Sequence, residues 1–306
     1  MKNIYLILAV LLILTSCNEE SSDHRTYDGL KGNVKSIESR TYEAKDVFGE
    51  IQKGTYLDES FKYTEYDFDG NRIKEGYYVR PSYYLHVSTY DENKNRVEMI
   101  EYKSSDHNSS GKINTRESFI YNDEGNLKEK NWFGSDNKLG TKYVYIYDDE
   151  GCLTEEKTYR ADGSFHSNVI YKNDSDCRTI ERLESRFDSR TTYKYNSSGF
   201  MIEEIHYDTE DGSIESSNKY RLNDDGYILE WIKYDEYFDD EIKKYVYERD
   251  RDNQLISREV YDQNELLIES YSFDYQEIDE YGNWTHKVEF ESGRPTKIIE
   301  RKIDYH

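Results

Sequence analysis

The chain has 306 residues and carries 64 acidic against 41 Lys and Arg side chains, a formal net charge of −23. Nucleic-acid binding requires a basic surface for the phosphates, so this charge excludes nucleic acid as a partner. The 32 tyrosines suit half-buried pleated surfaces, where the ring packs and the hydroxyl stays in water, and they predict β structure with thin cores.

The N-terminus has the pattern of a processing signal. Lys2 precedes an apolar run from Ile4 to Ile13, which is shorter than the roughly 20 residues of a membrane span. The segment Leu14-Thr-Ser-Cys17 resembles the lipobox of bacterial lipoproteins. The resemblance implies that residues 1–16 are a lipoprotein signal peptide and that Cys17 carries lipid. We therefore expect the bilayer to be a partner through the Cys17 anchor, because acyl chains contribute about 0.8 kcal/mol per buried CH₂.

Residues 17–27 are polar and acidic, with Glu19, Glu20 and Asp23 among them, and they read as a solvated tether. An acidic tether after the lipid cysteine resembles the surface-export signal of some Gram-negative lipoproteins, and a plain spacer explains it equally well. We expect an outer-membrane lipoprotein that faces the cell surface or the periplasm.

Residues 28–306 contain about nine copies of one pattern, with a period near 26. In the clearest copy, tyrosines alternate with other residues from Lys142 to Tyr147, as in a strand. Asp148 to Gly151 then supplies a turn, because Asp and Gly suit its backbone conformation. A second alternating run, Leu153 to Tyr159, completes a hairpin. The positions that align with Tyr147 are Tyr66, Tyr90, Tyr121, Tyr171, Tyr195, Leu222 and Arg249.

The unit Tyr-Asp-x-x-Gly-Asn, as in Tyr66 to Asn71, resembles the YD or RHS-type repeat of large bacterial exported proteins. The resemblance covers about residues 60–290, and members of that family roll hairpin ribbons into a hollow β-shell around a toxin. This chain has far fewer copies, and no toxin-like domain follows Tyr281. Leu30 to Ile37 looks like a capping half-repeat, and the charged segment Ile299 to Tyr305 is a candidate polar cap for the other end. We expect an all-β fold of tandem hairpins in a long, twisted, partly curled antiparallel sheet, an open shell or ribbon with a tyrosine-lined concave face.

Two cysteines follow Cys17 in the sequence, Cys152 and Cys177, and they lie 25 residues apart. Equivalent sites in successive hairpins are two strands apart, roughly 10 Å, whereas a disulfide needs Cα atoms within about 7 Å. No disulfide is expected here unless a turn is distorted.

Glutamates recur at one position of the second strand in several copies. Side chains at this position stack on one face of neighbouring hairpins and predict an acidic stripe for a cationic partner or a cation. The alternative is a solvated face balanced by nearby lysines such as Lys128, Lys130 and Lys157. The candidate residues are Glu129, Glu155, Glu203 and Glu230.

Two further patterns have a functional and a structural interpretation. Tyrosine ladders with Trp132, Trp231 and Trp284 suit stacking on sugar rings, but the same aromatics suit cross-strand packing. The pair Asp67 and Asp69 invites a calcium interpretation, but the further acidic ligands of an EF-hand loop do not follow. Turn chemistry explains these aspartates, so no metal and no cofactor are expected.

The sequence contains no catalytic motif. Its seven histidines are scattered, and no His-Glu-x-x-His, Gly-x-Ser-x-Gly, phosphate loop or Cys-x-x-Cys occurs. We expect a non-enzymatic, envelope-anchored lipoprotein whose array is a binding or scaffold module for an unknown protein or glycan ligand. One alternative is an immunity or chaperone-like partner of a secreted toxin. Another is a carbohydrate-active enzyme, because carboxylate pairs are abundant.

Overall fold

The computed structural model describes residues 23–57, 60–236 and 241–306, which form one short helix and 21 strands. The prediction of an all-β fold is confirmed. Residues 1–16 and Cys17 lie outside these ranges. Within them, no helix is long and apolar enough to span a bilayer. The elements are α1 (His24–Tyr27), β1 (Val34–Val47), β2 (Glu50–Tyr56), β3 (Lys62–Tyr66), β4 (Arg72–Val79), β5 (Ser82–Tyr90), β6 (Arg96–Ser104), β7 (Lys112–Tyr121), β8 (Leu127–Phe133), β9 (Leu139–Tyr147), β10 (Leu153–Arg160), β11 (Phe165–Asn173), β12 (Thr179–Glu184), β13 (Ser189–Tyr195), β14 (Met201–Asp208), β15 (Ile214–Leu222), β16 (Ile228–Asp235), β17 (Glu241–Arg249), β18 (Leu255–Tyr261), β19 (Leu267–Ile278), β20 (Trp284–Glu291) and β21 (Arg294–Tyr305).

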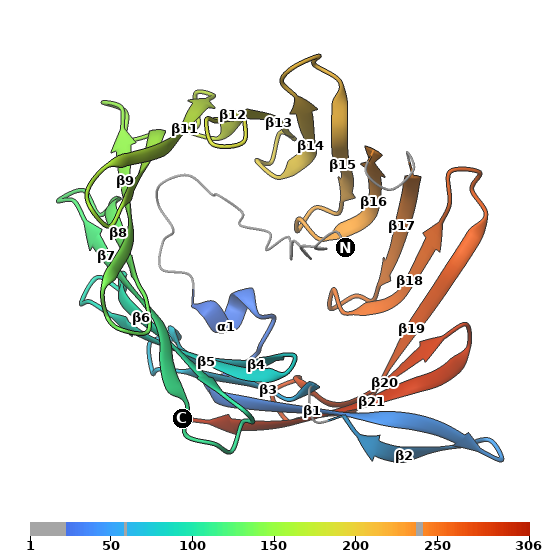
Figure 1. Ribbon diagram of the computed structural model, residues 1–306. Coiled ribbons are helices and arrows are strands. Elements are labelled where there is room, and N and C mark those ends of the chain that lie inside the picture. The colour runs from blue at the N-terminus through green and yellow to red at the C-terminus, as the bar shows by residue number, and fades with distance from the viewer. Residues whose placement is uncertain (1–22, 58–59, 237–240) are drawn as a thin grey trace.

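The strands close into a ring (Figure 1). From β3 onward each strand pairs antiparallel with the next, β21 pairs with β1, and β1 pairs with β3. The result is a 20-stranded antiparallel β-barrel, to which β2 adds a hairpin extension of β1. The expectation of an open shell or ribbon is therefore wrong.

The expected capping half-repeat and the expected polar cap meet in β1 and β21, which form the seam of the ring. β1 and β21 pair from Val34 opposite Tyr305 to Glu43 opposite Lys297. Unpaired strand edges favour association with other chains, and this pairing removes the two edges that an open ribbon would expose. Opposite charges face each other along the seam, with Glu38 opposite Lys302, Arg40 opposite Glu300 and Glu43 opposite Lys297.

The position of α1 identifies the inner face of the sheet, because α1 lies inside the ring in Figure 1. The Tyr66 hydroxyl donates a hydrogen bond to Asp28, directly after α1. Tyr66 is 1% exposed and packs with Leu30, Val34 and Ile37. The face that carries Tyr66 is therefore the inner face, and strand alternation assigns the other residues.

One turn type joins the two strands of each of nine hairpins at the same rim. The first turn residue is Asp or Asn, and its side chain accepts the backbone N–H four residues later, as Asp148 does from Cys152. The fourth residue is in the left-handed conformation, for example Gly151 at φ +84, which suits glycine. The sequence signal for these turns is thus local. The nine turns begin at Asp67, Asp91, Asn122, Asp148, Asp174, Asn196, Asn223, Asp250 and Asp279.

A tyrosine hydroxyl ties many hairpins to the preceding hairpin. The Tyr147 hydroxyl, on the residue before the turn, donates to the backbone carbonyl of Leu127 at 2.8 Å. The side chain of Asn173 makes the same bond to the Leu153 carbonyl at 2.7 Å. Asn173 immediately precedes the turn at Asp174, so it, and not Tyr171, is the residue equivalent to Tyr147. The other tyrosine bonds run from Tyr90 to Arg72, Tyr121 to Arg96, Tyr195 to Thr179 and Tyr275 to Leu255.

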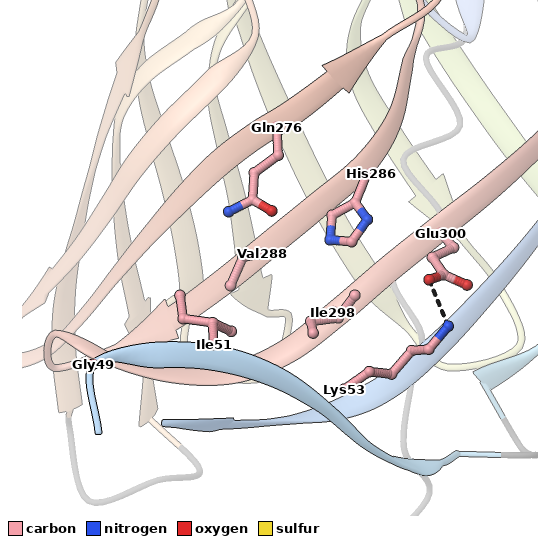
Figure 2. A pocket seen from close by; sticks show the side chains of 8 residues that line it. All are labelled: Gly49, Ile51, Lys53, Gln276, His286, Val288, Ile298 and Glu300. Atoms are coloured by element: carbon pink, nitrogen blue, oxygen red, sulfur yellow. Dashed lines mark hydrogen bonds and ion pairs between the residues drawn. The ribbon is translucent and has the colours of Figure 1, made fainter. Parts of the chain in front are cut away.

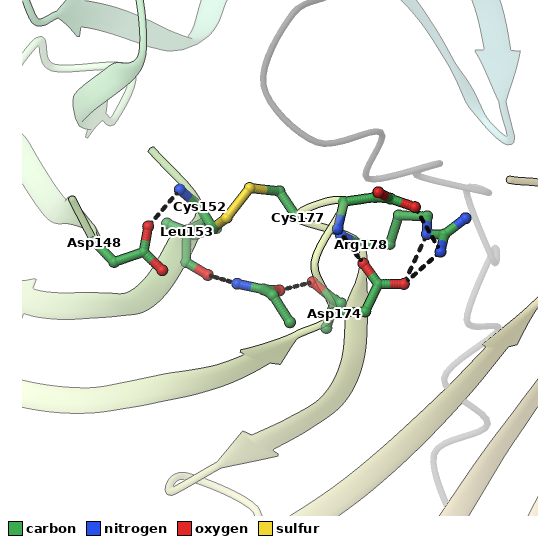
Figure 3. Close-up of a disulfide and its surroundings, with 9 residues drawn as sticks. Asp148, Cys152, Leu153, Asp174, Cys177 and Arg178 are labelled. Atoms are coloured by element: carbon green, nitrogen blue, oxygen red, sulfur yellow. Dashed lines mark hydrogen bonds and ion pairs between the residues drawn. A yellow bond between two sulfur atoms is a disulfide. The ribbon is translucent and has the colours of Figure 1, made fainter. Parts of the chain in front are cut away.

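Cys152 and Cys177 form a disulfide between neighbouring turns, which corrects the expectation of two separate cysteines (Figure 3). Their Cα atoms are 5.0 Å apart. The cysteines are not at equivalent turn positions: Cys152 follows the left-handed Gly151, whereas Cys177 itself is left-handed, at φ +59. Because the turns project beyond the sheet, the strand spacing does not apply to them.

Loss of one tyrosine hydroxyl tests the bonds between hairpins. We expect Tyr147→Phe to lower the free energy of unfolding by about 1 kcal/mol, because the Leu127 carbonyl loses its donor while the ring remains. Urea unfolding followed by far-UV circular dichroism measures the change. The matched control is Tyr245→Phe, because the Tyr245 ring stacks on Trp231. Its hydroxyl has no hydrogen bond within the described residues. Equal losses in both variants would contradict this role for the hydroxyl.

Candidate functional site

The inner wall of the ring is the candidate functional site, and aromatic side chains cover much of it. Trp231 stacks on Tyr245 with the ring centroids 4.6 Å apart, and its other neighbour is Tyr220 at 6.2 Å. Trp132 lies over Gly140 on the adjacent strand, where a Cβ atom would clash with the indole. These contacts are cross-strand packing, and they leave the rings half-buried.

The ring is wider than its own side chains can fill. Twenty strands spaced about 4.8 Å apart give a diameter of at least about 30 Å between backbones, because strand tilt only widens a barrel. Barrels of 16–18 strands already leave an aqueous channel. The inner wall therefore surrounds a space that can receive a ligand.

Charged residues lie among the inner aromatics, and several are paired. Arg182 binds Glu184 at 2.6 Å, and the His86 ring contacts Glu101 at 2.9 Å. Burial raises the pKa of Glu156 above its ordinary value. The same effect raises the pKa of Tyr171 to about 12. The inner wall is thus partly desolvated, which strengthens electrostatic interactions there.

The predicted glutamate column lies on the outer face, and each member has a basic neighbour. Glu203 is the most enclosed and lies between Lys194 and Lys219. The column is therefore a charge-compensated surface. The other contacts are Glu129 with Lys142, Glu155 with Lys157 at 3.1 Å, and Glu230 with Arg221 at 3.9 Å.

The same column contains two glutamates that the sequence reasoning missed. Glu98 contacts Arg116 at 3.2 Å, and Glu181 contacts Arg190 at 2.9 Å. Each glutamate of the column lies two residues after the first residue of its strand. The sequence analysis counted instead from the first apolar residue after the turn. It therefore missed Glu98 and Glu181, whose strands begin with the polar residues Arg96 and Thr179.

A cleft of about 480 Å³ lies between β2 and the outer face of β19, β20 and β21 (Figure 2). Val288 and Ile298 form its apolar floor and are only 1% and 3% exposed. Ile51 of β2 faces this floor, and Lys53 reaches Glu300 at 2.7 Å. The hairpin therefore covers an apolar part of the wall and is fixed there by an ion pair.

Among the described residues, no cluster of three or more His, Cys, Asp or Glu side chains could hold a metal ion. The turn aspartates are engaged in turn bonds, as Asp67 is with the Asn71 N–H at 2.9 Å.

No family model and no curated protein matches the chain. Among solved structures it is similar to TcdB2-TccC3-Cdc42, with 11% identity and a TM-score of 0.37, over 80% of this chain and 16% of that one. It is also similar to a porin-like protein from Bacteroides uniformis, with 10% identity and a TM-score of 0.37, over 90% and 99% of the two chains. The chain thus spans about a sixth of the length of the first protein. Likenesses this weak say nothing about function.

The outer glutamate column makes stability depend on pH. The hydrogen bond from Lys194 holds the pKa of Glu203 below its ordinary value. A carboxyl with a lowered folded pKa stabilises the fold at neutral pH, and this contribution is lost as pH falls through that pKa. We expect Glu203→Gln to lower stability at pH 7 and to reduce the difference between pH 7 and pH 3, measured by urea unfolding.

The control for this experiment is Glu150→Gln, an exposed turn position. It should keep the full difference between pH 7 and pH 3. If Glu203→Gln behaves in the same way, Glu203 contributes nothing to the pH dependence.

Proposed function

We propose that the chain is a non-enzymatic lipoprotein of the bacterial outer membrane, anchored by Cys17, whose ring binds a protein or glycan on its inner wall. One observation carries this proposal: the inner wall is lined with half-buried aromatic side chains, and the ring is too wide for its own side chains to fill. Ligand sites are concave and mostly apolar, with a few polar groups that give specificity.

The charged side chains of the outer face support the proposal that the ring stands in water beside the membrane. A barrel embedded in lipid presents an apolar band about 25 Å tall. This ring instead carries ion pairs such as Lys142 with Glu129, Lys157 with Glu155, and Arg190 with Glu181. A lipid on Cys17 and the tether of residues 17–27 would hold such a ring at the membrane without inserting it. It would face the cell surface or the periplasm.

The anchor is tested by replacing Cys17 with Ser. We expect the variant protein to move from the membrane pellet to the soluble envelope fraction, because the lipid is its only proposed attachment. Fractionation and immunoblotting measure the distribution. A variant that stays in the pellet would show that the ring itself, or another contact, holds the protein at the membrane.

The binding face is tested with a photo-cross-linking amino acid at two adjacent positions of β9. Tyr143 is on the inner face and Val144 is on the outer face, so the two positions share a strand and differ in direction. We expect cross-linked products in the native envelope from position 143 and not from position 144. Products from position 144 alone, equal products from both, or none from either would contradict inner-wall binding.

A further inference from the structure

Three cations gather on the inner wall next to the seam. Lys287 is on β20, and Lys297 and Arg301 are on β21. Glu289 contacts Lys287 at 3.0 Å and Lys297 at 3.5 Å. One carboxylate therefore serves both lysines.

Arg301 has no carboxylate partner within the described residues. Its guanidinium lies 3.5 Å above the centre of the Trp284 ring. Its Nε is buried and has no hydrogen-bond partner among those residues. The tyrosines Tyr275 and Tyr66 act on its charge first, and the carboxylate that follows them is Asp28, which is already bound to Arg72 at 2.5 Å and to the Tyr66 hydroxyl.

Lys287 is the second cation of the site. Its ammonium lies 5.1 Å from the centre of the Trp284 ring, so both cations border one indole. Burial lowers the pKa of Lys287; the contact with Glu289 opposes this effect, and the charge of Arg301 adds to it. Burial also lowers the pKa of Arg301 to about 10. The two like charges thus share a partly desolvated place without full compensation.

A guanidinium in a partly desolvated place without a carboxylate partner gains from an anionic acceptor, and a second cation beside it increases that gain. Some arginines of the inner and outer faces have a carboxylate, as Arg182 has Glu184 and Arg190 has Glu181, whereas Arg301 and Arg258 have none among the described residues. Arginine forms two parallel hydrogen bonds with a carboxylate or a phosphate, and a lysine beside it adds a point charge.

We propose that Arg301 and Lys287, beside Trp284, form a binding site for an oxyanion group of the ligand held in the ring. This inference deepens the proposed function and rests on it for the identity of the ligand. It predicts that the ligand carries a carboxylate or a phosphate at the part that contacts β20 and β21.

The test is calorimetric titration of the Cys17→Ser protein with citrate and, separately, with inorganic phosphate. We expect saturable binding of at least one probe, and the preferred probe distinguishes a carboxylate from a phosphate group. Arg301→Gln should weaken binding about tenfold or more, because each charge-assisted hydrogen bond contributes roughly one factor of ten. Lys287→Gln should weaken it in the same direction.

Arg258→Gln is the matched control. Arg258 also lies over an aromatic ring, Tyr271 at 4.2 Å, and its Nε also has no partner among the described residues. Its register neighbours are Tyr247 and Tyr271, so it is a stacked arginine without the lysine of the proposed site. We expect this variant to bind the probe as the parent does.

Urea unfolding without a probe shows whether each variant still folds. Arg301→Gln loses the stacking contact with Trp284 as well as a charge without a carboxylate partner, so its midpoint checks folding and the titration tests binding. No saturable binding of either probe by the folded parent, or equal weakening by Arg258→Gln, would overturn the proposal. Cross-linking at position 143 without anion binding would overturn this inference alone. Anion binding without that cross-link would overturn the proposed function and leave the anion site standing.

Discussion

The pairing of β1 with β21 is the contact on which the rest of the structure depends. It joins residues more than 250 positions apart and converts a row of hairpins into a closed ring. Val34 opposite Tyr305 and Ile37 opposite Ile303 place apolar side chains beside the Tyr66 cluster. Opposite charges face each other further along the same strands. Without this seam the sheet would have two exposed edges and no enclosed inner wall.

Away from the seam, the same kind of contact joins hairpin to hairpin around the ring. A turn that begins with Asp or Asn sets each hairpin, and a side chain before that turn binds a carbonyl of the preceding hairpin, as Tyr147 binds Leu127. An isolated hairpin is marginal in water, so each copy depends on its neighbours. The disulfide between Cys152 and Cys177 adds a covalent link of the same kind between two successive turns. Closure then gives every repeat two neighbours.

The sequence predicted what is local and missed what is distant. Alternating tyrosines and Asp-Gly turns identified the strands, because both signals lie within about ten residues. The seam was missed, because Glu38 and Lys302 reveal their relation only when the strands are already side by side. The disulfide was missed, because strand spacing does not describe where turns project. The glutamate column was identified in part. The cations Lys287 and Arg301 were missed, because the sequence has more acidic than basic residues and does not show which basic residues lack an acidic neighbour in the fold.

Closure gives the two faces different chemistry. The outer face has its acidic column compensated strand by strand, as Glu203 is between Lys194 and Lys219. The inner face keeps Arg301 without a carboxylate among the described residues. A net charge of −23 repels anions at long range, but charges in water are screened beyond about 8 Å at physiological ionic strength. Inside the ring the nearest charges therefore dominate. A ligand that enters meets Arg301 and Lys287 beside Trp284, and this local cationic and aromatic surface selects its chemistry more strongly than the overall charge does.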